Sequence, residues 1–106
     1  MLISQKNNLV TLINVFDTTP EQQQALIDAW TRFTEEVKDE PGFIAAALHK
    51  STDSTRVINY AHWRSQADFD AFVQRHGREF AQLGQNAILM DPHTYDVVYL
   101  HESADH

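Results

Sequence analysis

The sequence predicts a single α+β domain whose elements follow the order β-α-β-β-α-β. Three observations lead to this fold class. The 106 residues match the length of one compact domain. Short runs rich in β-branched and aromatic residues recur along the chain, and two segments with apolar residues at helical spacing lie between them. The sequence contains no repeat, linker or low-complexity segment, so residues 1–106 are expected to form one domain.

The N-terminal part contains a predicted strand and a long helix. Residues 9–16 (LVTLINVF) are apolar on both alternating sets, which predicts a central strand covered on both faces. Thr19 can cap the following helix, Pro20 suits its first position, and Gln22 completes a Thr-x-x-Gln capping box. We expect this helix to run to about Lys38. Its core-facing apolar stripe consists of Leu26, Ile27, Trp30, Phe33 and Val37.

Two turn signals frame a predicted hairpin. Pro41 and Gly42 end the helix, because proline disfavours helix at the preceding residue and glycine permits a turn. The three alanines of residues 43–50 (FIAAALHK) favour a helix, but the segment is short and lies between turn signals, so we interpret it as a strand. Residues 56–63 (RVINYAHW) form the second strand of this hairpin.

A second, shorter helix is predicted to begin at Ser65, with Asp68 completing its start signal. Gly77 indicates a break or kink in this helix. Its apolar residues at helical spacing are Phe69, Phe72 and Val73, and a further turn contains Phe80 and Leu83.

The C-terminal part is predicted to contain a connection, a last strand and a tail. Residues 84–92 are typical of a connection, and Asp91-Pro92-His93 is interpreted as the turn before the last strand. That strand spans residues 95–100 (YDVVYL), and the polar tail 102–106 is expected to fray. The complete order is the ferredoxin-like plan, in which one antiparallel sheet carries both helices on one face.

Both faces of the predicted sheet carry apolar side chains, although two helices can cover only one face. A second copy of the chain is the simplest cover for the other face, so we expect a homodimer. The candidates for the core of its interface are Ile44, Leu48, Ile58 and Tyr60.

Charge and composition argue against several partners and sites. The net charge is −7 and the basic residues are scattered, which argues against nucleic acid and anionic membranes as partners. The chain has no cysteine, so disulfides, thiolate catalysis and iron–sulfur clusters are excluded. No apolar run approaches a membrane span or a signal peptide, and we expect a cytoplasmic protein. A Gly-rich phosphate loop and metal-ligand spacing of histidines are both lacking, so no metal, flavin or haem is expected.

Two side chains in the second hairpin strand are candidates for chemistry. If Lys50 pairs with Arg56 across the turn, Asn59 and Trp63 share a face with small side chains that leave room for a ligand. The other residues of that face are then Phe43, Ala45 and Ala47. An amide here can donate a hydrogen bond to a substrate oxygen that gains negative charge during reaction.

A purely structural interpretation of the same residues stays open. Alanines also fit where helices approach a sheet closely, and Trp63 is then a core residue. An asparagine buried without a partner costs about 1 to 3 kcal/mol, so Asn59 would then pair with a backbone group or a neighbouring side chain.

Three motifs carry a resemblance to a known family. They are Pro41-Gly42-Phe43, Ser51-Thr52-Asp53 and Asn59-Tyr60-Ala61-His62-Trp63-Arg64-Ser65. Together they resemble the antibiotic biosynthesis monooxygenase family of small proteins that form dimeric α/β barrels. The likeness extends over nearly the whole chain in element order and length. The Asn-Tyr-Ala-x-Trp run is similar to that of members that oxidise aromatic anthrones to quinones.

The resemblance implies a cofactor-independent monooxygenase acting on an aromatic polyketide or quinol-type substrate. In this chemistry the deprotonated substrate passes an electron to O2, while the protein orients the substrate and stabilises its anion. By position, Asn59 and Trp63 would be the catalytic pair that contacts substrate oxygens. Phe69 stands where anthrone-oxidising relatives have Tyr, so one donor is missing here. The implied substrate-binding residues are Phe43, Ala45, Ala47, Trp30, Phe33, Phe69, Phe72 and Arg78.

The histidines leave alternatives open. His49 is expected near the edge of the pocket-side face, as a base or a solvated residue, and His62 on the dimer-facing side. Haem-degrading relatives supply an axial ligand from the second helix, so His76 with Trp63 suggests haem degradation as an alternative function. A surface position is the other interpretation of His76. A third candidate function is a non-catalytic, ligand-binding or stress-related dimer.

Overall fold

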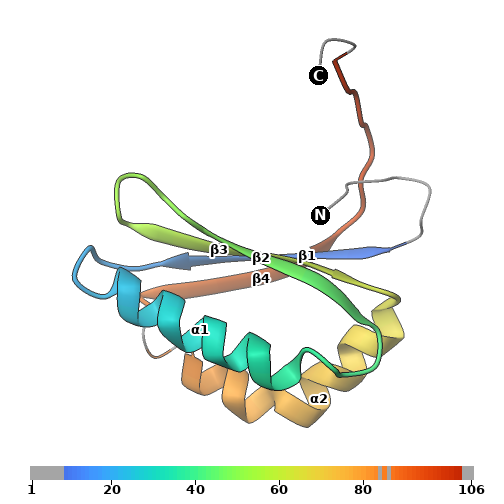
Figure 1. The fold of residues 1–106 in the computed structure, drawn as a ribbon, viewed down its shortest axis with the longest axis horizontal. Helices are drawn as coiled ribbons and strands as arrows, with labels where there is room; N and C mark the ends of the chain where they lie inside the picture. The colour runs from blue at the N-terminus through green and yellow to red at the C-terminus, as the bar shows by residue number, and fades with distance from the viewer. Residues whose placement is uncertain (1–8, 84, 86, 104–106) are drawn as a thin grey trace.

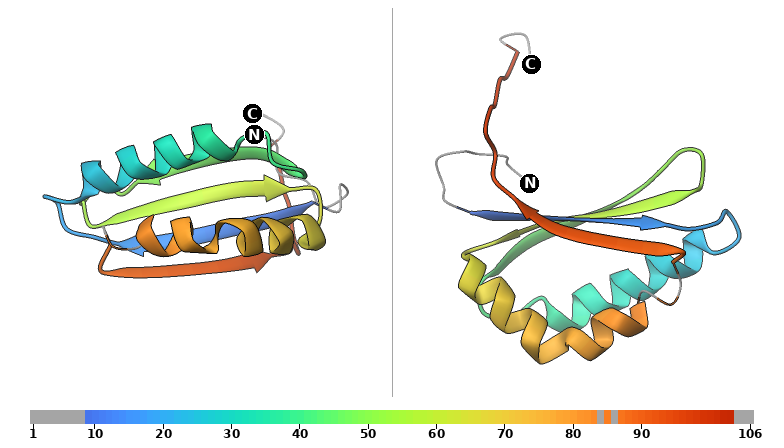
Figure 2. Two further views of the ribbon diagram at one scale, coloured as in Figure 1. Left: turned by 90° about the horizontal axis from the view of Figure 1, so that it is seen from below. Right: turned by 180° about the vertical axis from the view of Figure 1, so that it is seen from behind.

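The computed structural model describes residues 9–83, 85 and 87–103, which form one antiparallel sheet with two helices against it (Figure 1). The elements in chain order are β1 (Val10–Asp17), α1 (Gln23–Val37), β2 (Phe43–Lys50), β3 (Arg56–Trp63), α2 (Gln66–Leu83) and β4 (Leu89–Tyr95). Both helices lie on the same face of the sheet (Figure 2). The strand order β2-β3-β1-β4, with antiparallel neighbours throughout, confirms the predicted ferredoxin-like plan. Within the described ranges, neither helix is long and apolar enough to cross a membrane.

The start of α1 is held by contacts to its own turn and to the hairpin. Thr19 Oγ1 accepts a hydrogen bond from the backbone amide of Gln22 at 3.3 Å, so part of the predicted cap is present. The regular helix begins at Gln23, after this turn. The side chain of Gln23 donates to the carbonyl of Arg56 at 2.9 Å. This contact joins α1 to the β2–β3 hairpin and fixes the helix against the sheet.

The start of α2 is packed against the turn before β2. Ser65 Oγ accepts a hydrogen bond from the backbone amide of Asp68 at 3.1 Å, which confirms the predicted start signal. The Asp68 carboxylate also pairs with Arg64 at 2.7 Å. Gly42 has a φ of +85°, and a Cβ at this position would lie 2.4 Å from Asp68 Cβ. Only glycine fits here, because both the backbone conformation and the space exclude a side chain.

Aromatic rings fill the layer between the sheet and the helices. The Trp30 ring of α1 lies 5.1 Å from Phe16, 5.6 Å from Phe33 and 5.6 Å from Phe80, measured between ring centroids. Trp30 is 2% exposed and Phe16 is fully buried. These contacts join α1, α2 and β1 into one core, as the apolar stripe of the first predicted helix requires.

The register of the β2–β3 hairpin differs from the predicted one by a single residue. Lys50 pairs with Val57 and not with Arg56. An irregularity directly after Phe43 restores the predicted pair of Phe43 and Trp63. Between these two points, each β2 side chain lies on the face opposite to the predicted one, because a slip of one residue exchanges the faces of a strand.

Because of this shift, four residues lie on the opposite face of the sheet from the predicted one. Ala45, Ala47 and His49 pair with residues whose side chains point away from the helices, so the prediction that they face the pocket is wrong. Leu48 pairs with Asn59 and packs against the core, so its predicted place in a dimer interface is also wrong.

The last strand lies earlier in the chain than predicted. β4 spans Leu89–Tyr95, whereas residues 96–100, which were expected to form the strand, have no regular secondary structure. Pro92 pairs with Asn14 inside β4, so the predicted turn at this proline is wrong. β4 is an edge strand, and an edge tolerates proline because the missing N–H can face away from the sheet.

Beyond β4 the chain runs away from the domain on the side opposite the helices (Figures 1 and 2). Val98 is 88% exposed and Tyr99 is 78% exposed. Of the tail predicted to fray, Glu102 and Ser103 have no regular secondary structure, and residues 104–106 lie outside the described residues.

The face of the sheet opposite the helices, called here the open face, is largely apolar. Its central side chains are Ile13, Val15, Ile58, Tyr60 and His62. The prediction that Ile58, Tyr60 and His62 lie on this side is confirmed. His62 is only 4% exposed, and its ring packs against Tyr60 at 5.3 Å. Ile44, which was also predicted here, lies at the β2 irregularity and is 48% exposed.

Candidate functional site

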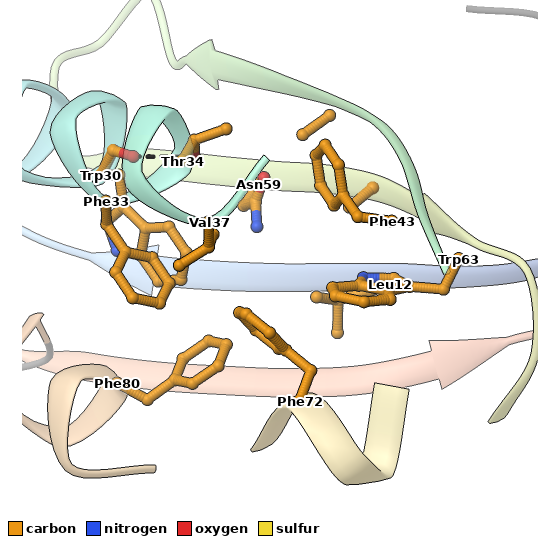
Figure 3. A pocket seen from close by; sticks show the side chains of 12 residues that line it. Leu12, Trp30, Phe33, Thr34, Val37, Phe43, Asn59, Trp63, Phe72 and Phe80 are labelled. Atoms are coloured by element: carbon orange, nitrogen blue, oxygen red, sulfur yellow. Dashed lines mark hydrogen bonds between the residues drawn. The ribbon is translucent and has the colours of Figure 1, made fainter. Parts of the chain in front are cut away.

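A small cavity, called here the inner cavity, lies between the sheet and the two helices (Figure 3). Its volume is about 20 Å³, which is room for one molecule of the size of water. The lining residues come from β1, α1, β2, β3 and α2. They are Leu12, Trp30, Phe33, Thr34, Val37, Phe43, Ala46, Asn59, Ala61, Trp63, Phe72 and Phe80.

Asn59 contributes an amide to the wall of the inner cavity. It is 5% exposed, and its Oδ1 has no hydrogen-bond partner among the described residues. The structural interpretation, in which neighbouring groups satisfy this side chain, therefore fails for the oxygen. A buried acceptor without a partner costs about 1 to 3 kcal/mol. Buried polar groups in native proteins are paired with protein, ordered water or a ligand, or they have a functional role.

A second buried amide, Asn14, lies directly opposite Asn59 on the neighbouring strand β1. Asn14 is fully buried, and both its Nδ2 and its Oδ1 lack hydrogen-bond partners among the described residues. Trp30 Nε1, in the same layer, is also buried and unpaired. Sequence reasoning missed Asn14, although one signal was available. It shares its face of the strand with Leu12 and Phe16, where a polar residue is out of place.

Trp63 lies on the same face of β3 as Asn59 and is 2% exposed. Its ring is surrounded by Phe72 at 4.7 Å, Phe43 at 5.4 Å and Phe69 at 5.6 Å. Trp63 is therefore a core residue and a wall of the inner cavity at once. The indole N–H is a donor only, which suits contact with an oxyanion or a peroxide oxygen.

A larger hollow, called here the α2–β4 groove, adjoins the inner cavity. It has a volume of about 270 Å³. Two of its residues, Leu12 and Phe80, also line the inner cavity and form a common wall. The complete lining is Leu12, Phe69, Val73, Gly77, Phe80, Ala81, Met90 and Pro92.

Comparison with known protein families assigns the chain to one of them. The model of the antibiotic biosynthesis monooxygenase family matches residues 9–82. The chain belongs to this family. The matched range includes both buried amides and Trp63, and it ends within α2.

One relative by sequence and two solved structures are similar to this chain. Tetracenomycin-F1 monooxygenase from Streptomyces glaucescens is 47% identical over 70 residues, which cover 65% of this chain and 62% of the relative. The monooxygenase from the gene ActVA-Orf6 of Streptomyces coelicolor, solved with nanaomycin D, has a TM-score of 0.73 at 21% identity, covering 95% of this chain and 96% of that chain. A variant of SnoaB, a cofactor-independent oxygenase from Streptomyces nogalater, has a TM-score of 0.71 at 16% identity and covers 88% and 96%, respectively. The two solved structures share the fold.

The predicted site residues of this family member fall into three groups. Trp30, Phe33, Phe43, Asn59, Trp63 and Phe72 line the inner cavity, and Phe69 lines the α2–β4 groove. Ala45 and Ala47 lie on the open face and cannot contact a ligand between the sheet and the helices. Arg78 is exposed and belongs to the lining of neither hollow.

His76 lies at the kink of α2, with φ −119° and ψ 18°, which confirms the break predicted near Gly77. Its Nε2 is hydrogen bonded to Glu40 Oε1 at 2.5 Å, and Arg75 pairs with the same carboxylate at 2.9 Å. The hydrogen bond from His76 and then that from Arg75 hold the pKa of the Glu40 carboxyl below its usual range. The His76 ring packs on Phe72 at 4.9 Å but lines neither hollow. Its geometry therefore does not favour the role of a haem ligand.

Among the described residues, no cluster of three or more His, Cys, Asp or Glu side chains could hold a metal ion. The polar side chains that line the inner cavity are the amide of Asn59, the hydroxyl of Thr34 and the indoles of Trp30 and Trp63, and the hydroxyl already donates to the carbonyl of Trp30. Neutral donors of this kind can stabilise an anion without taking up a proton themselves. The arrangement suits a reaction in which negative charge develops on a bound molecule.

Proposed function

We propose that this protein is a cofactor-independent monooxygenase that oxidises an aromatic polyketide, of the anthrone or quinol type, with O2. One observation carries the proposal: buried amide atoms without partners lie beside an indole in an otherwise apolar layer. The 47% identical relative, named for its action on tetracenomycin F1, supports a polyketide substrate. The description of SnoaB as cofactor-independent supports a reaction that uses only the substrate and O2.

The reaction begins with a phenolic substrate that loses a proton and becomes electron-rich. This anion passes one electron to O2, and the resulting substrate radical and superoxide combine into a peroxide on carbon. Loss of the remaining proton from that carbon and breakage of the O–O bond leave one oxygen atom on it as a carbonyl. The other oxygen atom leaves as water, so an anthrone methylene becomes the carbonyl of a quinone.

Each polar residue has a distinct part in this scheme. Asn59 donates from its Nδ2 to the phenolate oxygen, and Trp63 donates from Nε1 to the developing oxyanion or peroxide. Asn14 lies opposite Asn59 on β1 and does not line the inner cavity, and its amide atoms make no hydrogen bond to Asn59. We therefore assign it a positioning role through packing beside that amide. The inner cavity, at about 20 Å³, has room for one small group such as a projecting substrate oxygen, and the rings of the substrate lie outside it.

The protein acts as a homodimer in this proposal, with two open faces packed against each other. The support is the apolar character of Ile13, Val15, Ile58 and Tyr60, which the described helices leave uncovered. The exposed segment after β4 leaves the domain on the same side and carries Val98 and Tyr99. A second copy would cover both features.

An oxygen electrode tests the proposed function directly. The wild-type protein, prepared in metal-depleted buffer, is mixed with an anthrone that carries hydroxyls beside its carbonyl. The expected result is consumption of one O2 per anthrone, with quinone formation well above the rate of uncatalysed autoxidation. Rates equal to the autoxidation control across a panel of anthrones and naphthol-type hydroquinones would overturn the proposal.

A further inference from the structure

The α2–β4 groove has the size and shape to hold part of a fused aromatic molecule. Its volume of about 270 Å³ is just below the roughly 300 to 1,000 Å³ typical of pockets that enclose a whole small-molecule ligand. Phe69 and Phe80 present aromatic surface on the helix side, and Met90 and Pro92 close the strand side. A flat ring can therefore lie between α2 and β4.

The apolar lining of the groove restricts which ligands can bind more than its volume does. None of its eight lining side chains carries a hydrogen-bonding group, apart from the weakly accepting thioether of Met90. A hydroxyl group buried against this lining loses its hydrogen bonds to water and finds no replacement. The loss corresponds to roughly tenfold or more in affinity for each such hydroxyl.

The groove is also aligned with the polar site. Leu12 and Phe80 line both the groove and the inner cavity, so the two hollows are neighbours. Phe69, which also lines the groove, contacts the Trp63 ring at 5.6 Å. A ring system that enters the groove therefore brings its other end toward Asn59 and Trp63.

We infer that the α2–β4 groove binds the ring of the substrate that carries no hydroxyl group, and directs the oxygen-bearing part toward Asn59 and Trp63. This inference rests on the proposed function, because it concerns the same substrate. It defines a substrate class: aromatic polyketides in which at least one outer ring has an apolar edge. Molecules with hydroxyls on the edges of both outer rings are poor ligands in either orientation.

Two stable quinones test the inference without any turnover. One is a dihydroxyanthraquinone with both hydroxyls on the same outer ring, each beside a carbonyl, and the other is a tetrahydroxyanthraquinone with two more hydroxyls on the edge of the other outer ring. Calorimetric titration of the wild-type protein is expected to show binding of the dihydroxy compound at least about tenfold tighter. Equal affinities, or no binding of the dihydroxy compound, would overturn the inference.

Variants then locate the bound ring. A Cβ added at Gly77 meets nothing within 4 Å, so Gly77→Leu fills the groove without displacing a neighbour. It is expected to weaken binding of the dihydroxy quinone about tenfold. Gln74→Leu places the same side chain on α2 at an exposed position outside the groove and serves as the matched control. Wild-type affinity in Gly77→Leu would contradict the inference, as would equal losses in both variants.

Polarity is tested at the strand side of the groove. Met90→Gln brings an amide of similar length to the lining and is expected to reduce the preference for the dihydroxy quinone, whereas Met90→Leu changes only shape and keeps the preference. An unchanged preference in Met90→Gln counts against the inference.

Quinone binding that follows these rules without oxygen uptake would reject the proposed function alone. If the wild-type protein oxidises the substrate and Gly77→Leu keeps full activity, only the inference about the groove would be rejected.

Discussion

The two faces of the sheet are built from the same strands but treat polar groups in opposite ways. On the helix-covered face, Asn14 and Asn59 are buried with unpaired amide atoms in an aromatic layer. On the open face, His62 Nε2 lies 3.3 Å from the hydroxyl of Tyr60, so its buried polar atom has a partner. The covered face gives up stability around the site, as functional sites commonly do. The described helices do not cover the open face.

The largest expected effect comes from a charge on the open face. Ile58→Asp would place an unpaired carboxylate in the proposed dimer interface, and is expected to dissociate or unfold the protein. Sedimentation velocity at micromolar concentration, with thermal unfolding, measures both outcomes. Thr52→Asp adds the same charge at the exposed hairpin turn and serves as the control. A wild-type monomer at this concentration would contradict the prediction.

The covered face predicts the next largest effect, on turnover. Asn59→Ala and Trp63→Phe are each expected to lower kcat about tenfold or more with little change in KM, because each removes a donor used in the transition state. Trp63→Phe keeps most of the packing and removes the N–H, so it separates chemistry from stability. Steady-state oxygen uptake provides the rates, and melting curves show whether each variant is folded. Full activity of Trp63→Phe would make this tryptophan a packing residue only.

Asn14 gives the sharpest contrast between stability and function. Asn14→Leu has nearly the same shape and removes two unpaired polar atoms, so it is expected to raise the free energy of unfolding by about 1 kcal/mol. The same change is expected to lower kcat, because Asn59 then lies beside an apolar side chain in place of an amide. Urea unfolding and oxygen uptake on the same sample test both signs. A variant that is less stable, or equally active, would show that Asn14 has no such role.

The smallest expected effect is a pH dependence of the free energy of unfolding that arises from His62 on the open face. Burial lowers the pKa of His62 below its ordinary value of 6.5, so the unfolded chain binds a proton more readily than the folded one. Stability from the neutral ring is present above pH 6.5 and is lost as the pH falls from there toward the folded pKa. Unfolding measured across this range in wild type and His62→Gln tests the prediction. Identical pH profiles would assign the dependence to other groups.

Local signals in the sequence predicted most of the fold. The bounds of β2 and β3 agree with the prediction, because turn residues such as Gly42 and Ser51 stand at both ends of the hairpin. The start of α2 followed from the capping residue Ser65. β4 was missed because Pro92 is a turn signal in most contexts, and only the strand order shows that it lies at an edge.

The candidate site was predictable only in part. Asn59 and Trp63 were found because a polar and a large side chain share one strand face. Ala45 and Ala47 were misplaced because the irregularity after Phe43 shifts the register, and no residue type marks such a shift in the sequence. Asn14 could be recognised as a candidate only from the structure, in which it lies opposite Asn59 and both amides are buried beneath the helices.

Pro92 also limits how these molecules can aggregate. An exposed edge strand offers a row of backbone donors and acceptors to any passing strand, and proteins protect such edges to avoid growth into extended sheets. Pro92 stands in the middle of this edge strand, opposite Asn14, and a proline has no N–H to donate to a neighbouring strand. A strand approaching β4 would meet a gap in the middle of its ladder. Edge-to-edge pairing of two molecules through β4 is therefore disfavoured. Contact between the open faces of two sheets is the more accessible route to self-association.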